Sequence, residues 1–209
     1  MSSPLDAARA ALSDRDPAEA AAACGFEHSE TPGGALVTGL LLTRPFALEL
    51  PGLDAAWRDD GTPVPSFLTA LVVYHLAVAD GTPPRGRWVS YAELPDGSFY
   101  VAAWRSYTPD ALVRHFGDRI DDLRQTAAPL GGEPLTLPGD LALRFDLLPR
   151  MPVALLYHRS DDEFPARADV LFDANASHQL PTDGCALLTR QLVSMLIAAD
   201  PHPPAPRGV

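Results

Sequence analysis

Two neighbouring apolar runs in the second half of the chain limit its fold more than any other feature. Leu141, Leu143 and Phe145 alternate with small or charged residues, as in a strand with one buried face. Residues 152–158 form a more continuous apolar run, of the kind found in a strand buried on both faces. The connector at 148–151 is short enough for a hairpin. These runs therefore predict a pair of antiparallel strands.

Helical signals lie before and after this pair. Proline at the first helical position is favourable, so Pro4 and Pro17 predict two short helices within an N-terminal segment, residues 1–25. Apolar residues at helical spacing predict three further helices, which begin near Thr62, Thr108 and Thr182. The first of these is apolar on nearly every face and is expected to be buried.

Further strands are predicted from short apolar runs bounded by turn residues. They cover residues 35–43, 46–50, 88–91 and 99–104, with a turn at 95–97 between the last two. Groups of strands separated by helices indicate an α+β fold, with a mostly antiparallel sheet and flanking helices. We expect a single domain over residues 1–200 and a disordered, proline-rich tail at 201–209.

Composition narrows the classes of partner. The net charge is −11 and all 16 basic side chains are arginine, so a phosphate backbone or an anionic membrane surface is an unfavourable partner. The N-terminus has no signal-peptide pattern, and the longest apolar run is too short to cross a bilayer. We therefore expect a cytoplasmic protein. Its two cysteines, Cys24 and Cys185, are expected to remain free thiols.

Polar residues between the apolar runs are the first candidates for a site. Asp162 and Glu163 belong to a run of three carboxylates, which repel one another unless a cation or an arginine relieves them. Asp173 ends the next apolar run, and His178 follows it. If these four residues converge, they offer the ligand types of a mixed oxygen and nitrogen metal site. The alternatives are a solvated acidic loop, an Asx turn at Asp173 and a structural histidine.

Aromatic residues supply a second candidate. Trp88, Tyr91 and Trp104 lie close together in sequence, along with Tyr100 and Tyr107. On adjacent strands such side chains share a face and can line a pocket for a flat ligand. A plain aromatic core is the alternative explanation.

Several short segments occur in an order that resembles a prokaryotic family classed as a domain of unknown function. They are DGTP at 80–83, WVSYAEL at 88–94, FG at 116–117, DEFP at 162–165, LFD at 171–173 and LP at 180–181. Some family members carry this domain beside an iron–sulfur cluster domain, which implies a link to redox or cofactor metabolism. This chain lacks cluster-ligating cysteines, so the resemblance implies no cluster here, and it implies no established activity.

Three functions are compatible with these features. The preferred hypothesis is an accessory protein that binds a small molecule or cofactor, with a tetrapyrrole-like ligand as one possibility. The second is a metal-assisted hydrolase that uses Asp162, Glu163, Asp173 and His178. The third is a structural or interaction protein without a ligand. A ligand site requires a pocket, a catalytic site requires convergent polar groups, and a partner surface requires an exposed apolar patch.

Overall fold

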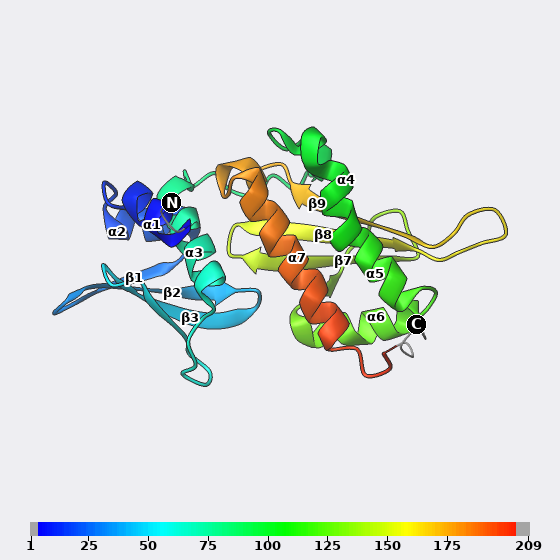
Figure 1. Ribbon diagram of the computed structural model, residues 1–209, viewed down its shortest axis with the longest axis horizontal. Helices are drawn as coiled ribbons and strands as arrows, with labels where there is room; N and C mark the ends of the chain where they lie inside the picture. The colour runs from blue at the N-terminus through cyan, green and yellow to red at the C-terminus, as the bar shows by residue number, and fades with distance from the viewer. Residues whose placement is uncertain (1–3, 204–209) are drawn as a thin grey trace.

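The predicted hairpin forms the middle of a five-stranded antiparallel sheet in the computed structural model, which describes residues 4–203 (Figure 1). Val153 pairs with Phe145 on one side and with Phe172 on the other, and this register places large apolar side chains on one face. The strand order is β5-β9-β8-β7-β6. The bounds are β5 (Trp88–Ser90), β6 (Glu133–Pro134), β7 (Leu141–Leu148), β8 (Met151–His158) and β9 (Arg167–Asp173).

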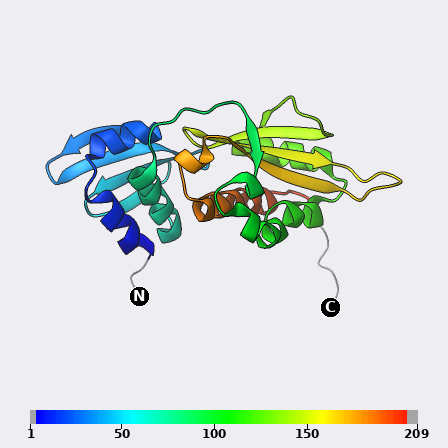
Figure 2. The ribbon, with the colours of Figure 1, turned by 90° about the horizontal axis from the view of Figure 1, so that it is seen from above.

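Helices cover the apolar face of this sheet, as Figure 2 shows from above. They are α4 (Gly97–Tyr107), α5 (Pro109–Phe116), α6 (Ile120–Ala127) and α7 (Thr182–Ala198). Short 3-10 turns lie at η1 (Tyr91–Glu93), η2 (Ala128–Leu130) and η3 (Ala176–His178). The hydroxyl of Tyr157 in β8 donates to the backbone carbonyl of Gly117 at 2.6 Å, which fixes the end of α5 to the sheet.

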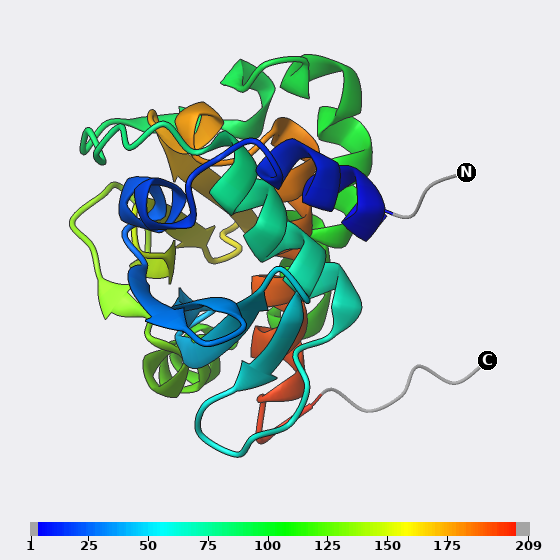
Figure 3. The same ribbon diagram turned by 90° about the vertical axis from the view of Figure 1, so that its left-hand side faces the viewer.

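A second, four-stranded antiparallel sheet occupies the N-terminal half, in the order β1-β2-β3-β4 (Figure 3). Its strands are β1 (Glu27–Thr31), β2 (Gly34–Leu41), β3 (Arg44–Leu50) and β4 (Asp54–Trp57), and its helices are α1 (Pro4–Leu12), α2 (Pro17–Cys24) and α3 (Ser66–Val78). Helix α3 is buried along most of its length, as predicted. Like every other helix in the described part of the chain, it is too short or too polar to cross a membrane.

The two sheets share one hydrophobic core, so the prediction of an α+β domain is confirmed, with its strands divided between two antiparallel sheets. Where the sheets meet, the backbone N–H of Leu42 donates to the carbonyl of Leu147 at 2.9 Å. The boundary at residue 200 stays a prediction. The predicted tail is described only as far as residue 203, and residues 204–209 lie outside the described part.

The strand predicted at 99–104 is wrong, because these residues form the middle of α4. Tyr100, Ala103, Trp104 and Tyr107 recur at helical spacing, and this period outweighs the preference of single aromatic residues for strands. The turn at 95–97 was predicted to join two strands, but it leads into this helix instead.

Both cysteines are free, as predicted, and both are buried. Burial raises the pKa of the Cys24 thiol to about 12 and also raises the pKa of Cys185. Both side chains therefore remain protonated at neutral pH and act as small apolar groups in the core.

His75 is buried in α3, where its ring Nδ1 lies 2.8 Å from the backbone carbonyl of Gln179. This contact links α3 to the segment that precedes α7. Burial lowers the pKa of His75 from 6.5 to about 4, because the cation would lose its hydration, and the positive charges of Arg150 and Arg15 act in the same direction.

We expect acid to destabilise the protein through His75. Between about pH 6.5 and pH 4 the unfolded chain binds a proton that the folded chain does not, so stability falls as the pH is lowered. The loss should reach on the order of 3 kcal/mol. Chemical denaturation of the wild type and His75→Gln across this range measures it. The variant should show a flatter dependence of unfolding free energy on pH, and parallel curves would contradict the assignment.

Candidate functional site

Helices α4 and α7 lie side by side and run in the same direction (Figure 1). Where they begin, the hydroxyl of Thr182 donates to the backbone carbonyl of Pro95 at 2.6 Å. Further along, the guanidinium of Arg190 lies over the ring of Tyr107, 5.5 Å from its centre. Contacts at both ends therefore hold the two helices as walls of a common groove.

This groove encloses about 690 Å³. Tyr100, Ala103 and Tyr107 line it from α4, and Ala186 and Leu187 line it from α7. Residues three, four or seven apart share a helix face, so each helix presents one continuous stripe to the groove. The small alanine side chains in the middle of both stripes leave the space between the helices open.

Tyr91 lines the groove from the 3-10 turn η1. Its ring is buried and stacks on Trp104 with centres 4.5 Å apart and planes within 6° of each other. The indole N–H of Trp104 donates to the hydroxyl of Thr189 at 3.1 Å, which fixes the stack against α7. Burial, followed by the neighbouring Tyr107, raises the pKa of Tyr91 to about 12. Its hydroxyl is therefore a neutral hydrogen-bond donor, and it has no hydrogen-bond partner among the described residues.

Charged side chains lie at the two ends of the groove. Asp96 and Asp183 stand where α4 and α7 begin, and Arg190 stands two turns further along α7. The groove thus combines an aromatic and apolar wall with a few polar groups, which is typical of a small-molecule site.

The structure brings together two of the three predicted aromatic residues. Tyr91 and Trp104 form the stack, although from a 3-10 turn and a helix rather than from adjacent strands. Trp88 lies apart from them, because it pairs with Asp173 in the sheet and its side chain projects to the face opposite that of Val89. Trp88 does not line the groove.

Asp173 has a structural environment. Its side chain is buried and accepts hydrogen bonds from the backbone N–H groups of Arg85, Gly86 and Asn175 at 2.8, 2.6 and 3.0 Å. The bond from Asn175 is the Asx turn considered from the sequence. The other two bonds fasten the segment that crosses from α3 to β5 (Figure 2).

The acidic run lies far from Asp173. Asp162 and Glu163 are exposed in the loop before β9, while Asp173 is the last residue of that strand, about 20 Å away at strand rise. Asp161 accepts the backbone N–H groups of Glu163 and Phe164, which lower its pKa. Direct metal bonds are about 2–2.6 Å long, so a single ion cannot join the two ends of β9.

His178 is half-exposed, and its ring Nδ1 lies 2.7 Å from the carboxylate of Asp80. Hydrogen bonds from Thr82 and from His178 hold the pKa of Asp80 well below its usual range. The pair joins the start of the crossing segment to the turn before α7, so its geometry accounts for His178 without a ligand.

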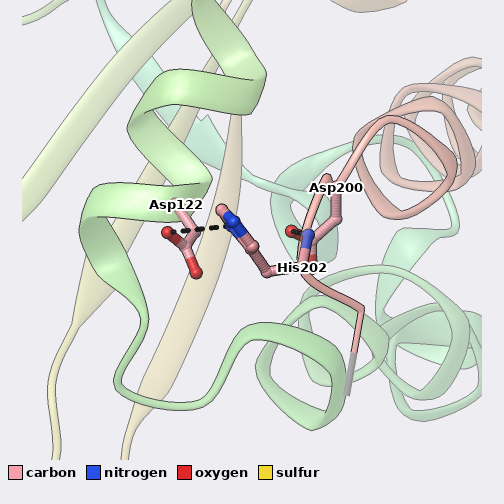
Figure 4. A group of neighbouring side chains, drawn as sticks. All are labelled: Asp122, Asp200 and His202. Atoms are coloured by element: carbon pink, nitrogen blue, oxygen red, sulfur yellow. Dashed lines mark hydrogen bonds and ion pairs between the residues drawn. The ribbon is translucent and has the colours of Figure 1, made fainter. Parts of the chain in front are cut away.

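Asp122, Asp200 and His202 form another group with possible metal-ligand atoms (Figure 4). Arg119 already lies between them, since its guanidinium donates to both carboxylates at 2.9 Å and to the carbonyl of His202 at 2.8 Å. Burial raises the pKa of Asp200, but the hydrogen bonds from Arg119, from the backbone N–H of His202 and from His115, together with the charge of Arg119, outweigh it and bring the pKa to about 2. Arg119 thus supplies the positive charge that would otherwise come from a metal ion beside the two carboxylates. The cluster of Asp122, Asp200, His202 and Arg119 fastens the chain after α7 to α6.

Sequence reasoning missed Arg190 and Asp183 as groove residues. Both lie on the last predicted helix, at the spacing that places Asp183, Ala186, Leu187 and Arg190 on one face. That spacing was visible in the sequence. The facing helix is not evident there, because the sequence at 99–104 predicts a strand.

Comparison with known proteins assigns the chain to a family. A family model described as a domain of unknown function (DUF3786) matches residues 16–195. The chain belongs to this family. No curated protein and no solved structure matches it. All residues that line the groove lie within the matched part of this DUF3786 chain, so the groove is part of the family domain itself.

We predict that Asp173 stabilises the DUF3786 fold and that Asp162 does not. Asp173→Asn turns an amide N–H₂ toward backbone donors and should reduce the unfolding free energy by about 1–3 kcal/mol. Asp162→Asn removes the same charge from an exposed loop and should leave stability within about 0.5 kcal/mol of the wild type. Urea denaturation of both variants distinguishes them, and equal losses would contradict this assignment.

Proposed function

We propose that this DUF3786 protein binds a small organic molecule with an aromatic or apolar body, and that the ligand occupies the groove between α4 and α7. The groove volume of about 690 Å³ falls within the range of ligand pockets, about 300–1,000 Å³. Buried free thiols fit a reducing compartment, so we also place the protein in the cytoplasm.

Tyr91 is the observation that carries this proposal. A tyrosine hydroxyl close to a protein core ordinarily finds a hydrogen-bond partner within the protein. The Tyr91 ring is fixed by its stack on Trp104, yet its hydroxyl has no such partner among the described residues, and the side chain borders the groove. A ligand with an acceptor atom would satisfy this donor while its apolar part covers the ring.

The other hypotheses from the sequence have less support. A metal tetrapyrrole needs an axial histidine to bind its metal, but no histidine of the described chain lines the groove. A metal-assisted hydrolase lacks convergent carboxylates, since Asp162 and Asp173 lie at opposite ends of β9. A redox-linked ligand that the protein holds without metal bonds is compatible with the proposed site.

A protein partner is the second candidate function, and one observation favours it. Phe99 and Tyr100 on α4 are 80 % and 63 % exposed, and Tyr100 belongs to the groove. Large exposed aromatic side chains are enriched at protein interfaces. If this surface is a docking site, Phe99 should matter as much as the groove.

The test introduces a large side chain at a position that lines the groove and compares it with the same substitution at a neighbouring position that does not. Ala103 and Ala102 are both exposed on α4, but only Ala103 lines the groove. We expect Ala103→Phe to weaken binding of the fluorescent probe 8-anilinonaphthalene-1-sulfonate by about tenfold or more, because the new ring occupies the site. Ala102→Phe should bind the probe like the wild type. Fluorescence titration gives the dissociation constants, and thermal unfolding checks that both variants fold.

Equal probe affinity in the wild type and Ala103→Phe would contradict the groove as a site. Phe99→Ser separates the two candidate functions. A loss of probe binding in Phe99→Ser, with none in Ala103→Phe, would favour the exposed aromatic surface and a protein partner.

A further inference from the structure

The charges of the groove are separated by sign along its length. Asp96 and Asp183 form an acidic end, and Arg190 forms a basic end seven residues further along α7. At a rise of 1.5 Å per residue, this is about 10 Å along the helix axis. Tyr100 and Ala186 belong to the uncharged middle.

The protein itself makes little use of these three charges. None of them forms an ion pair within residues 4–203. Asp96 takes the N-cap position of α4, but its side chain accepts no helix N–H, and the carboxylate of Asp183 accepts the N–H of Gly184 at 2.9 Å. The guanidinium of Arg190 lies over the face of Tyr107 and donates no hydrogen bond to residues 4–203, so its donors remain available.

We infer that the groove takes a zwitterion whose charges lie about 10 Å apart, with its cationic end at Asp96 and Asp183 and its carboxylate at Arg190. A short peptide with free termini has this chemistry, because three extended residues span about 10 Å. The inference rests on the proposed function and names its ligand class. The planar guanidinium of Arg190 matches a carboxylate in bidentate geometry. A central apolar side chain would cover Tyr91 and Tyr100.

Ligands with two like charges fit this arrangement less well. A diamine would place its second ammonium group beside Arg190, and a dicarboxylate would place its second carboxylate beside Asp96 and Asp183. Like charges in contact are a source of discrimination between ligands, so the groove should select against both classes.

The first arm of the test uses the unmodified protein. The peptide Ala-Phe-Ala should displace 8-anilinonaphthalene-1-sulfonate from the groove. N-acetylation or C-terminal amidation should each weaken that displacement by about fivefold, the effect of one exposed ion pair of about 1 kcal/mol. The straight-chain ω-amino acid 8-aminooctanoate should also compete if the two charges suffice. If the peptide competes and 8-aminooctanoate does not, then the groove recognises the peptide backbone or the aromatic ring in addition to the two charges.

The second arm assigns each charge to one end. In Arg190→Gln the free acid and the amide should bind equally, while acetylation still weakens binding. In the double variant Asp96→Asn with Asp183→Asn, the free and the acetylated peptides should bind equally, while amidation still weakens binding. Arg124→Gln is the matched control, since Arg124 is an exposed arginine on α6 that does not line the groove, and it should behave like the wild type.

Equal affinity for the free, acetylated and amidated peptides, or failure of both zwitterions to displace the probe, would overturn the inference. The proposed function fails separately, through equal probe binding by the wild type and Ala103→Phe. The peptide series uses only the unmodified protein. It can therefore contradict the inference even if Arg190→Gln fails to fold.

Discussion

The buried carboxylate of Asp173 fixes the segment that crosses between the two sheets, and the first residues of the candidate site follow soon after that segment. Residues 79–87 have no regular secondary structure, so their backbone polar groups need partners from elsewhere in the chain. Asp173 accepts two of the N–H groups, and the side chains of Asn175 and Gln179 both donate to the carbonyl of Thr82. Arg150 donates to the carbonyl of Gly81 at 2.6 Å. Residues around the end of β9 thus replace the hydrogen bonds that a helix or strand would have supplied.

The crossing segment determines where the groove lies. It ends in β5, which pairs with β9 beside Asp173 and leads directly into the turn that carries Tyr91. Glu93 accepts both the backbone N–H and the hydroxyl of Ser90, at 2.7 and 2.8 Å, and so closes that turn before α4 begins. The segments that form the family resemblance at 80–83, 88–94, 171–173 and 180–181 therefore support or line one site, although up to about a hundred residues separate them.

Much of the fold was predictable because its signals are local. The hairpin of β7 and β8, the start of α2 at Pro17 and the break after Phe116 follow from apolar period, proline position and a glycine. The short strands β1 and β4 were missed, since β1 is polar and mostly exposed and β4 has only four residues. The site was harder to predict, because it depends on which helices become neighbours. Asp173 illustrates this, since its residue type and position allowed both a ligand and a turn, and only its three backbone donors decide between them.

The walls of the groove are fastened behind the site, which bears on how a ligand would bind. Trp104 donates to Thr189, whose hydroxyl donates in turn to the carbonyl of Cys185 at 3.0 Å, and all three residues are buried. The bond from Trp104 joins α4 to α7 beneath the groove and uses no side chain at the acidic or basic end. A ligand would therefore meet walls that are already in place, and it would spend little of its interaction energy on ordering them. Because the groove side chains on α4 are exposed, they can be exchanged while the stack and hydrogen bonds beneath them hold the helices together. Binding and folding can thus be examined separately in this protein.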